Sequence, residues 1–311
     1  MTNRLILDTD GGVDDAQALL MLLANDRAPV AITTVFGNVG LDAATINILD
    51  VLAVAGSAIP VHAGADRPLV APIVDARDIH GEDGLGGAIR PDSAAEPAGL
   101  DGVGFLADAL LEAAAIGERI DILAIGPLTN IALMLRLAPE AVEGLGTLTI
   151  MGGTLNGRGN ITPAAEFNIY ADPEAAAAVF RSVPTVIVPW EPCTTHLLTG
   201  DEIEAAFKGL PQADVTQFSL ALAQHARRTS LSYGGADVLR FVDPLAAAVV
   251  ISPDIATGAI EASVDVALAE GVARGMTVID PSFRLGTPRA RLIETVDGNA
   301  LRALYVRSIG G

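Results

Sequence analysis

The sequence has little cysteine, little histidine and few basic residues. A single cysteine, Cys193, excludes an intrachain disulfide and fits a reducing compartment. Zinc clusters draw their ligands mainly from Cys and His, so four histidines and one cysteine argue against such a cluster. With 19 Lys and Arg against 38 Asp and Glu, the formal net charge is -19 at pH 7, which opposes binding to phosphate backbones and anionic lipid surfaces. We therefore expect no nucleic-acid partner.

Long apolar runs are missing as well. Asp, Gly or Pro interrupts every Ala-rich stretch before it reaches the roughly 20 apolar residues of a membrane-spanning helix. Met1–Arg4 leads directly into a strand-like segment, without the apolar region of a signal peptide. These absences predict a cytoplasmic protein with no membrane contact. At 311 residues and 50% hydrophobic content, the chain can bury a large core without disulfides.

What the sequence does contain is an alternation of strand-like and helix-like segments. Such alternation implies right-handed crossovers and a mainly parallel sheet. We predict the α/β class, with a single domain over residues 1–311 whose central, mainly parallel, Rossmann-like sheet is flanked by helices. The predicted strands are Arg4–Asp8, Val30–Val35, Pro60–His62, Ile120–Ile125, Leu148–Met151 and Thr185–Val188. The predicted helices are Asp14–Asn25, Leu41–Gly56, Val103–Ala115, a segment that ends at Leu137, Pro173–Arg181, Asp201–Phe207, Val215–Arg228 and Pro244–Ile251.

Two parts of the chain depart from this alternation. Between Asp66 and Leu100 the periodicity is lost while Gly, Pro and Asp accumulate, and so long a loop in a compact domain is usually functional or disordered. Its glycines would let it move over a site, so we expect a lid there. Later in the chain, Ala259–Leu268 and Leu301–Val306 are interpreted as terminal strands.

Four carboxylates lie within eight residues, at Asp8, Asp10, Asp14 and Asp15. Acids this close raise one another's pKa unless a cation or well-placed donors compensate them, and a hard cation with oxygen ligands is the simplest compensation. The acids follow the first predicted strand, and ligands of open parallel sheets bind beyond the carboxyl ends of the strands. A helix cap would explain Asp14 alone. The cluster therefore predicts a site.

Other polar groups follow predicted strands and would reach the same edge of the sheet. Asn38 comes after the second strand, and Ile125 begins the Gly-Pro turn after a later one. Asp243 stands before Pro244 at the start of an Ala-rich helix. Asp243 could therefore join the N-terminal aspartates at the site. The alternative is a purely structural role as a helix cap, with proline at the first helical position.

Glu166 and Asn168 flank Phe167. In an extended segment both polar side chains would face one way and the phenyl ring the other. A carboxylate beside an amide suits the vicinal hydroxyls of a sugar as acceptor and donor. A strand with a polar face and one buried phenylalanine is the alternative.

At this point the residues resemble a known family. The segment Asp8–Ala18 meets every fixed position of the signature DTDxGxDDxxA of the nucleoside hydrolases, the calcium-dependent N-ribohydrolases of the inosine–uridine-preferring type. The family often has proline where this chain has Gly11, a change expected to loosen the turn without removing a ligand. Later blocks resemble the family in order along most of the chain: Thr33–Asn38, His80–Gly86, Gly126–Asn130, Met151–Gly153, Glu166–Asn168 and Val242–Pro244.

The resemblance implies hydrolysis of the N-glycosidic bond of ribonucleosides to ribose and free base. It implies a Ca2+ ion bound by Asp10, Asp15, Asp243 and the backbone carbonyl of Ile125. Asp10 would also be the general base for a water held by the metal, and Asp8 would support the strand end. The ribose would be held by Asp14, Asn38, Glu166 and Asn168, with Met151 packed near the sugar. The family also suggests a homodimer or homotetramer.

The chemistry of these residues agrees with that implication. Calcium takes about six to eight oxygen ligands, so three carboxylates and a carbonyl leave positions for water and for sugar hydroxyls. Cleavage of an N-glycosidic bond passes through an oxocarbenium-like state, and a strongly acidic pocket stabilises its positive charge.

The sequence departs from the family at Val242. Many pyrimidine-accepting or non-specific members have a histidine there as the acid for the leaving base, and valine cannot donate a proton. Candidate base-side or leaving-group residues are His80, His225, Arg228 and Tyr233, although each also fits an ordinary loop, helix-surface or packing role. The missing histidine favours purine nucleosides, whose ring can be activated by protonation.

Two alternatives stay open from the sequence alone. Asp8–Gly11 also resembles the DxDG nucleophile motif of haloacid-dehalogenase-type phosphatases, but that interpretation leaves Asp14, Asp15 and the later blocks unexplained. The second alternative, prompted by Val242, is a calcium-dependent nucleoside or ribose binder without turnover.

Overall fold

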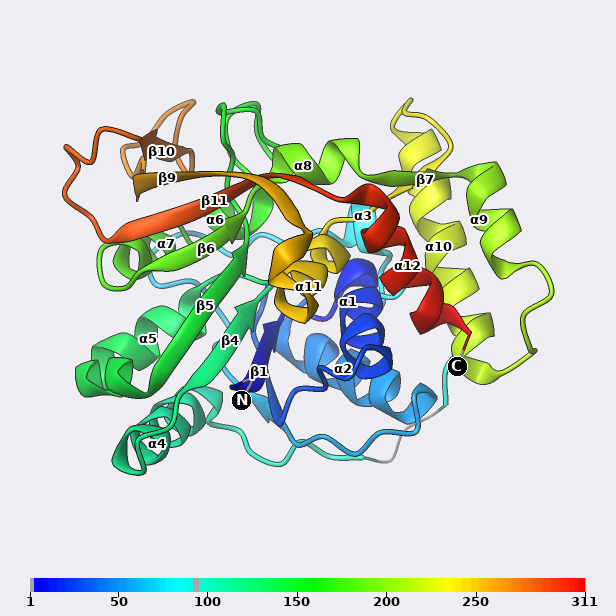
Figure 1. The fold of residues 1–311 in the computed structure, drawn as a ribbon, viewed down its shortest axis with the longest axis horizontal. Helices are drawn as coiled ribbons and strands as arrows, with labels where there is room; N and C mark the ends of the chain where they lie inside the picture. Colours follow the sequence, from blue (N-terminus) through cyan, green and yellow to red (C-terminus); the bar gives the residue numbers. More distant parts are fainter. Residues whose placement is uncertain (1–2, 92–94, 311) are drawn as a thin grey trace.

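The computed structural model describes residues 3–91 and 95–310, and its main feature is a nine-stranded sheet (Figure 1). The strand order is β10-β9-β11-β6-β5-β4-β1-β2-β3. Every neighbouring pair from β11 to β3 is parallel, whereas β9 runs antiparallel to both β10 and β11. The predicted α/β class with a mainly parallel sheet is confirmed. Residues 1, 2 and 311 of the predicted domain lie outside the described part.

The elements have the following bounds. The strands are β1 Arg4–Thr9, β2 Ala31–Thr34, β3 Val61–Ala63, β4 Ile120–Ala124, β5 Leu145–Met151, β6 Thr185–Val188, β7 Leu197–Thr199, β8 Val238–Arg240, β9 Ala256–Val266, β10 Thr277–Asp280 and β11 Arg289–Val296. The α-helices are α1 Val13–Ala24, α2 Leu41–Val54, α3 Arg77–His80, α4 Gly102–Ala115, α5 Thr129–Leu137, α6 Phe167–Ala171, α7 Pro173–Phe180, α8 Trp190–Thr195, α9 Gly200–Phe207, α10 Asp214–Ser232, α11 Asp243–Ile251 and α12 Gly298–Ile309. Short 3-10 helices span Pro139–Gly144 and Pro253–Ile255, and β7 pairs with β8 in a separate sheet.

The order of the strands makes β1 the point at which the sheet changes its direction of growth. β2 and β3 extend the sheet on one side of β1, while β4, β5 and β6 extend it on the other. The direction of the crossovers therefore reverses at β1, and open α/β sheets bind ligands at such a switch point. Because β1 ends at Thr9, the turn from Asp10 into α1 lies there.

The alternation of β1 explains how both faces of the sheet are covered. Leu5 and Leu7 pack in a core cluster with residues of α1, α2, α11 and α12, whereas Ile6 packs in a cluster with α4, α5 and α7. α1, α11 and α12 lie together on one face (Figure 1). Full burial of such side chains contributes about 1.5–3 kcal/mol each. The two clusters thus hold β1 and α1 in place around the site.

The prediction of a terminal strand at Leu301–Val306 is wrong, because these residues lie in α12. Asp297 precedes the helix, and its carboxylate accepts hydrogen bonds from the backbone N–H groups of Asn299 and Ala300. Leu301, Tyr305 and Ile309 are buried and four residues apart, which is the spacing of one helix face. The strand expected at Ala259–Leu268 is present as β9, while β10 and β11 were not anticipated.

The segment expected to be a lid is irregular apart from α3. Arg90 fastens its middle part to α2, with Nε 2.9 Å from Asp50 Oδ2 and Nη1 2.8 Å from Asp83 Oδ2. Asn47 of α2 also donates a hydrogen bond to the Asp83 carbonyl at 2.8 Å. Residues 92–94 of this segment lie outside the described residues, and movement of the segment stays a prediction.

In the described part of the chain, no helix is both long enough and apolar enough to cross a membrane.

Candidate active site

A cavity of about 670 Å³ opens beyond the carboxyl ends of the central strands. Its wall includes Asp14 after β1, Asn38 after β2, Ile125 after β4 and Met151 at the end of β5, and Asp243 at the start of α11 completes the floor. The volume is in the range of sites that take a small organic ligand. The strand ends therefore bring together the polar groups that the sequence predicted to meet.

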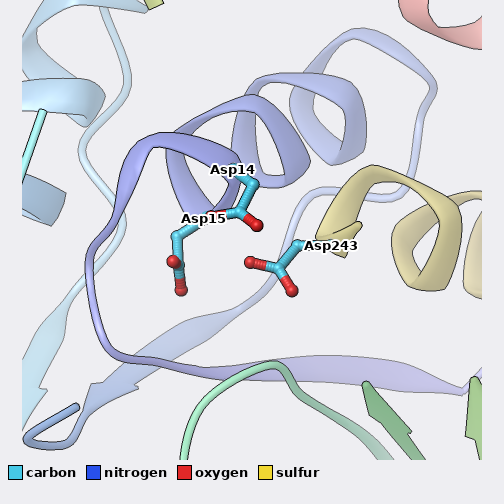
Figure 2. A group of neighbouring side chains, drawn as sticks. All are labelled: Asp14, Asp15 and Asp243. Atoms are coloured by element: carbon cyan, nitrogen blue, oxygen red, sulfur yellow. The ribbon is translucent and has the colours of Figure 1, made fainter. Parts of the chain in front are cut away.

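Three acids converge in this cavity (Figure 2). Asp14 and Asp15 belong to the first turn of α1 and Asp243 to the first turn of α11, and their carboxylates point toward one shared space. One carboxylate oxygen from each lies within 4.8 Å of the others. The N-terminal ends of two helices meet here, and their dipoles favour negative charge. The arrangement is a candidate cation site.

The start of α1 shows which acid has a structural role. Gly12 is the N-cap, and Asp15 Oδ2 accepts a hydrogen bond from the Gly12 N–H at 2.8 Å. Asp15 Oδ1 accepts from the Thr9 hydroxyl and from the Asp10 N–H at 3.2 Å. Asp14 is not a cap, and its Oδ1 is buried without a hydrogen-bond partner among the described residues. That oxygen is free for a ligand.

The turn before α1 has a conformation at Gly11 that favours glycine, and whether it is looser than a turn with proline stays a prediction. Gly11 has φ 68°, and a Cβ atom there would lie 2.7 Å from backbone atoms of Ala44. Its carbonyl accepts a hydrogen bond from Asn47 Nδ2 at 2.9 Å. Proline is locked near φ −65° and cannot adopt this conformation. This chain therefore reaches the site through a turn specific to glycine.

Asp10 does not belong to the group of three converging acids and is not among the residues that line the cavity. Asn38 orients it, because the Asn38 backbone N–H donates to Asp10 Oδ2 at 2.8 Å and Nδ2 donates to Oδ1 at 2.9 Å. Asn38 Nδ2 also donates to Asp15 Oδ2 at 3.0 Å. A Cβ atom at Gly37 would lie 2.0 Å from Asp10 Oδ2, so glycine is needed for this close approach. The Asn38 amide hydrogens thus serve the acids, which leaves its oxygen for a ligand.

Burial is the main cause of unusual pKa values in this group. It raises the pKa of Asp14 to about 6 and the pKa of Asp15, Asp10 and Asp243 above their ordinary values. The charge of Asp15 raises the pKa of Asp10 further, and the charge of Asp14 does the same for Asp15 and Asp243. The hydrogen-bond donors around these acids do not offset their burial and mutual repulsion, so the site fits a hard cation with oxygen ligands.

The carbonyl of Ile125 adds a neutral oxygen to the same region. It accepts one hydrogen bond, from Asn168 Nδ2 at 3.0 Å, and a carbonyl oxygen has a second lone pair. Asn168 Nδ2 also donates to the Met151 carbonyl at 3.2 Å. Asn168 therefore holds two strand ends together at the cavity.

The extended segment that both interpretations of Glu166, Phe167 and Asn168 assumed is wrong, because Phe167 and Asn168 lie in α6. Glu166 is the N-cap of α6, and its carboxylate accepts from the backbone N–H groups of Asn168 at 2.9 Å, Ile169 at 3.2 Å and Gly153 at 2.9 Å. Glu166 and Asn168 still line the cavity, together with Phe167. Burial raises the pKa of Glu166 to about 7.

His80 lines the cavity in its neutral form. Its Nδ1 accepts a hydrogen bond from the Val13 N–H at 3.1 Å, and burial lowers its pKa to about 4. The 3.6 Å separation between His80 Nδ1 and Asp14 Oδ1 is therefore not an ion pair. His80 connects α3 with the first turn of α1.

Helix α10 forms the opposite wall and is tied to α3. His225 Nε2 donates to the Ile79 carbonyl at 2.8 Å, and the Tyr233 hydroxyl donates to Asp78 Oδ2 at 2.7 Å. His225 and Tyr233 both line the cavity. Arg228 does not; it lines a separate depression with Gln224, Arg227, Leu231 and Asp237. Arg228 is thus the one candidate base-side residue that the structure does not bring to the cavity.

The cavity is also lined by polar residues that the sequence did not single out, among them Gln17, Asn160 and Arg240. Gln17 occupies a variable position of the signature, but its place three residues after Asp14 puts it on the same helix face. Arg240 stands two residues before Val242, which also lines the cavity. Asn160 lies in an irregular Gly-containing loop, where no sequence signal marks it.

Fold and site together define an α/β enzyme with a buried acidic site at the switch point of its sheet. The family model described as inosine-uridine preferring nucleoside hydrolase matches residues 5–303. The non-specific ribonucleoside hydrolase RihC of Klebsiella pneumoniae (strain 342) is 38% identical over 291 residues, which is 93% of this chain and 92% of the relative.

Solved structures give the same result. The plant nucleoside hydrolase PpNRh1 superposes with a TM-score of 0.90 at 28% identity and covers 100% of both chains. An inosine-guanosine nucleoside hydrolase superposes with a TM-score of 0.86 at 30% identity and covers 100% of this chain and 99% of its own.

The chain belongs to the inosine-uridine preferring nucleoside hydrolase family. It is a nucleoside N-ribohydrolase, its substrate is a ribonucleoside, and the family is metal-dependent. The family match includes Asp8–Gly11 together with the later blocks, which the phosphatase alternative left unexplained.

Proposed function

We propose that the protein hydrolyses ribonucleosides to ribose and free base with Ca2+ as its metal and Asp10 as the general base. The observation that carries this proposal is the convergence of Asp14, Asp15 and Asp243 in a buried cavity. Carboxylates and a carbonyl oxygen are ligands that suit calcium.

The metal would be held by Asp10, Asp15, Asp243 and the carbonyl of Ile125. Asp14 and Asp15 are adjacent on α1, so one turn of helix contributes to both the metal and the sugar. When bound, a calcium ion acidifies a coordinated water and orients it and the sugar hydroxyls. The orphaned Oδ1 of Asp14 supports a ligand at this position.

Asp10 would accept the proton of the attacking water. A general base must lie within hydrogen-bond reach of the proton that it accepts. Asn38 holds both oxygens of Asp10 in one orientation. As the glycosidic bond breaks, the surrounding carboxylates would stabilise the positive charge of the oxocarbenium-like sugar.

The sugar would lie between Asp14, Asn38, Glu166 and Asn168, above Met151. Asn38 and Asn168 use their amide hydrogens on protein oxygens, so their side-chain oxygens are the groups left to accept from ribose hydroxyls. Glu166 is oriented by three backbone donors. These contacts support preorganised sugar binding.

The base would lie toward α3 and α10, near His80, His225 and Tyr233. Purine nucleosides are the preferred substrates in this proposal, because Val242 removes the histidine acid that would serve a pyrimidine. The similar inosine-guanosine hydrolase supports this preference, whereas RihC is described as non-specific. Kinetic constants for inosine, guanosine, adenosine, uridine and cytidine under one set of conditions test it.

The main experiment compares wild-type protein with Asp10→Ala. We expect the variant to lose at least about a hundredfold in kcat on inosine, because the water then has no positioned base. Asp108→Asn, on the exposed side of α4, is the matched control and keeps wild-type rates. Chelation of the metal should also abolish turnover, and added Ca2+ should restore it.

Absence of hydrolysis by the wild-type protein would contradict the proposal. If wild-type protein with Ca2+ releases no reducing sugar from nucleosides or from p-nitrophenyl riboside, the proposed activity is wrong. Nucleoside binding by calorimetry without turnover would then favour the binder that lacks catalysis. Sedimentation equilibrium tests the homodimer or homotetramer that the family resemblance suggests.

A further inference from the structure

Gln17 is a buried polar side chain with no partner in the part of the chain that the structure describes. It is 1% exposed, and neither Oε1 nor Nε2 makes a hydrogen bond there. It nevertheless lines the cavity. A buried amide without a partner costs about 1–3 kcal/mol, and a ligand atom in the cavity would relieve that cost.

Gln17 is no less exposed than some other residues that line the cavity. Ile125 and Met151 line the same cavity and are each also 1% exposed. Glu166, placed on the sugar in the proposed function, is 2% exposed. Low exposure is therefore shared by Gln17 and by residues already assigned to the site.

The neighbours of Gln17 on α1 locate it between the sugar side and the base side. Asp14 is three residues earlier and Val13 four residues earlier, so all three share one face, and each lines the cavity. Asp14 belongs to the sugar side. Val13 is hydrogen bonded to His80, on the wall assigned to the base. Side chains on a helix lean toward its N-terminus, which directs Gln17 toward these two.

We infer that Gln17 hydrogen bonds the edge of the nucleobase and contributes to base recognition, an inference that rests on the proposed function. A primary amide offers a donor and an acceptor side by side, and so do the edges of nucleobases. Rotation of the amide by 180° exchanges the two, so one side chain serves 6-oxo and 6-amino purines. Gln17 would thereby supply a polar contact to the base in a chain with valine at position 242.

The test is the ratio of kcat/KM for inosine to kcat/KM for p-nitrophenyl riboside, whose aryl ring has no ring nitrogen or N–H donor. In Gln17→Leu the ratio should fall about tenfold, because one hydrogen bond to the base is lost. Gln17→Asn keeps the amide but is one methylene shorter, and it should lower the ratio as well. Thr216→Val is the matched control, since Thr216 has a buried hydroxyl without a partner yet does not line the cavity.

Two results would overturn the inference. An unchanged ratio with equal losses on both substrates would place Gln17 at the sugar, and unchanged rates on both would leave it without a substrate contact. Melting temperatures of all variants confirm folding. Should wild-type protein turn over neither substrate, the proposed function fails separately. In that case calorimetry measures the affinity of wild type and of Gln17→Leu for inosine and for ribose. The inference then requires the ratio of the inosine affinity to the ribose affinity to fall about tenfold in Gln17→Leu.

Discussion

Neighbouring acids of the signature differ in what surrounds them. Asp8 lies under the site, where Oδ1 accepts from the Thr33 hydroxyl at 2.5 Å and from Asn130 Nδ2 at 2.7 Å, and it thus ties β1 to β2 and α5. Asp15 closes the first turn of α1, and Asp14 has a free oxygen at the cavity. Spacing predicted that acids would gather here, and the structure groups Asp14 and Asp15 with Asp243 and leaves Asp10 outside that group. Spacing did not reveal that Asp10 is turned toward Asn38, because that orientation depends on a strand distant in sequence.

At Glu166 we predict a pH dependence of stability. Burial raises its pKa in the folded protein to about 7, from an ordinary value of 4.5. The folded state therefore holds a proton that the unfolded state has lost, so this residue's contribution to stability falls between about pH 4.5 and 7 and is constant above that. The difference amounts to up to about 3 kcal/mol.

Urea unfolding at pH 5, 6, 7 and 8 with a chelator present measures this effect. Glu166→Gln should show a flatter profile than wild type, because the amide does not titrate. The variant loses the hydrogen bond from the Asn168 N–H, so its absolute stability at pH 5 should be lower. Parallel profiles for the two proteins would contradict the prediction.

The helices and strands with a clear period were predictable, and those that depend on distant partners were not. β6 and the start of α2 were placed correctly from the sequence, because buried strands and amphipathic helices have distinct patterns. β11 was missed: only its first four residues alternate in burial, and its place between β9 and β6 is decided by tertiary pairing. In α12 the strand was predicted from a short apolar run, whereas the buried residues Leu301, Tyr305 and Ile309 follow the four-residue spacing of a helix.

At the level of elements, Arg90 is predicted to hold the segment that carries His80. In Arg90→Ala, Asp50 loses its charge partner, and its side chain is only 8% exposed in the wild-type structure. We expect a loss of about 2 kcal/mol in the free energy of unfolding, between the values for exposed and buried pairs. Faster proteolysis within residues 81–91 and a higher KM for inosine should accompany it.

A double-mutant cycle with Asp50→Ala checks this prediction. The coupling free energy between the two positions should be positive, and Arg67→Ala, whose pair with Asp66 is exposed, should change stability little. Additive effects at positions 90 and 50 would show that the contact does not hold the segment.

For the molecule as a whole, the crowded acids predict stabilisation by metal. Ca2+ binds the folded state through groups that repel one another without it, so calcium at about a hundred times its Kd adds about 2.7 kcal/mol. The melting temperature should therefore rise by several degrees with Ca2+ and fall with a chelator. Asp243→Asn should lose most of the calcium effect. Identical melting curves in calcium and in chelator would contradict the metal assignment.

The packing of α12 against α1 has a consequence for the order in which the protein matures. Asn25, just after α1, donates hydrogen bonds to the carbonyls of Met21 and Leu304, and α1 shares its core with Leu301 and Tyr305. While a ribosome is still making residues 298–309, the first helix lacks this cover, although Asp14 and Asp15 were among the first residues translated. A nascent chain should accordingly bind calcium only weakly until this late helix has emerged.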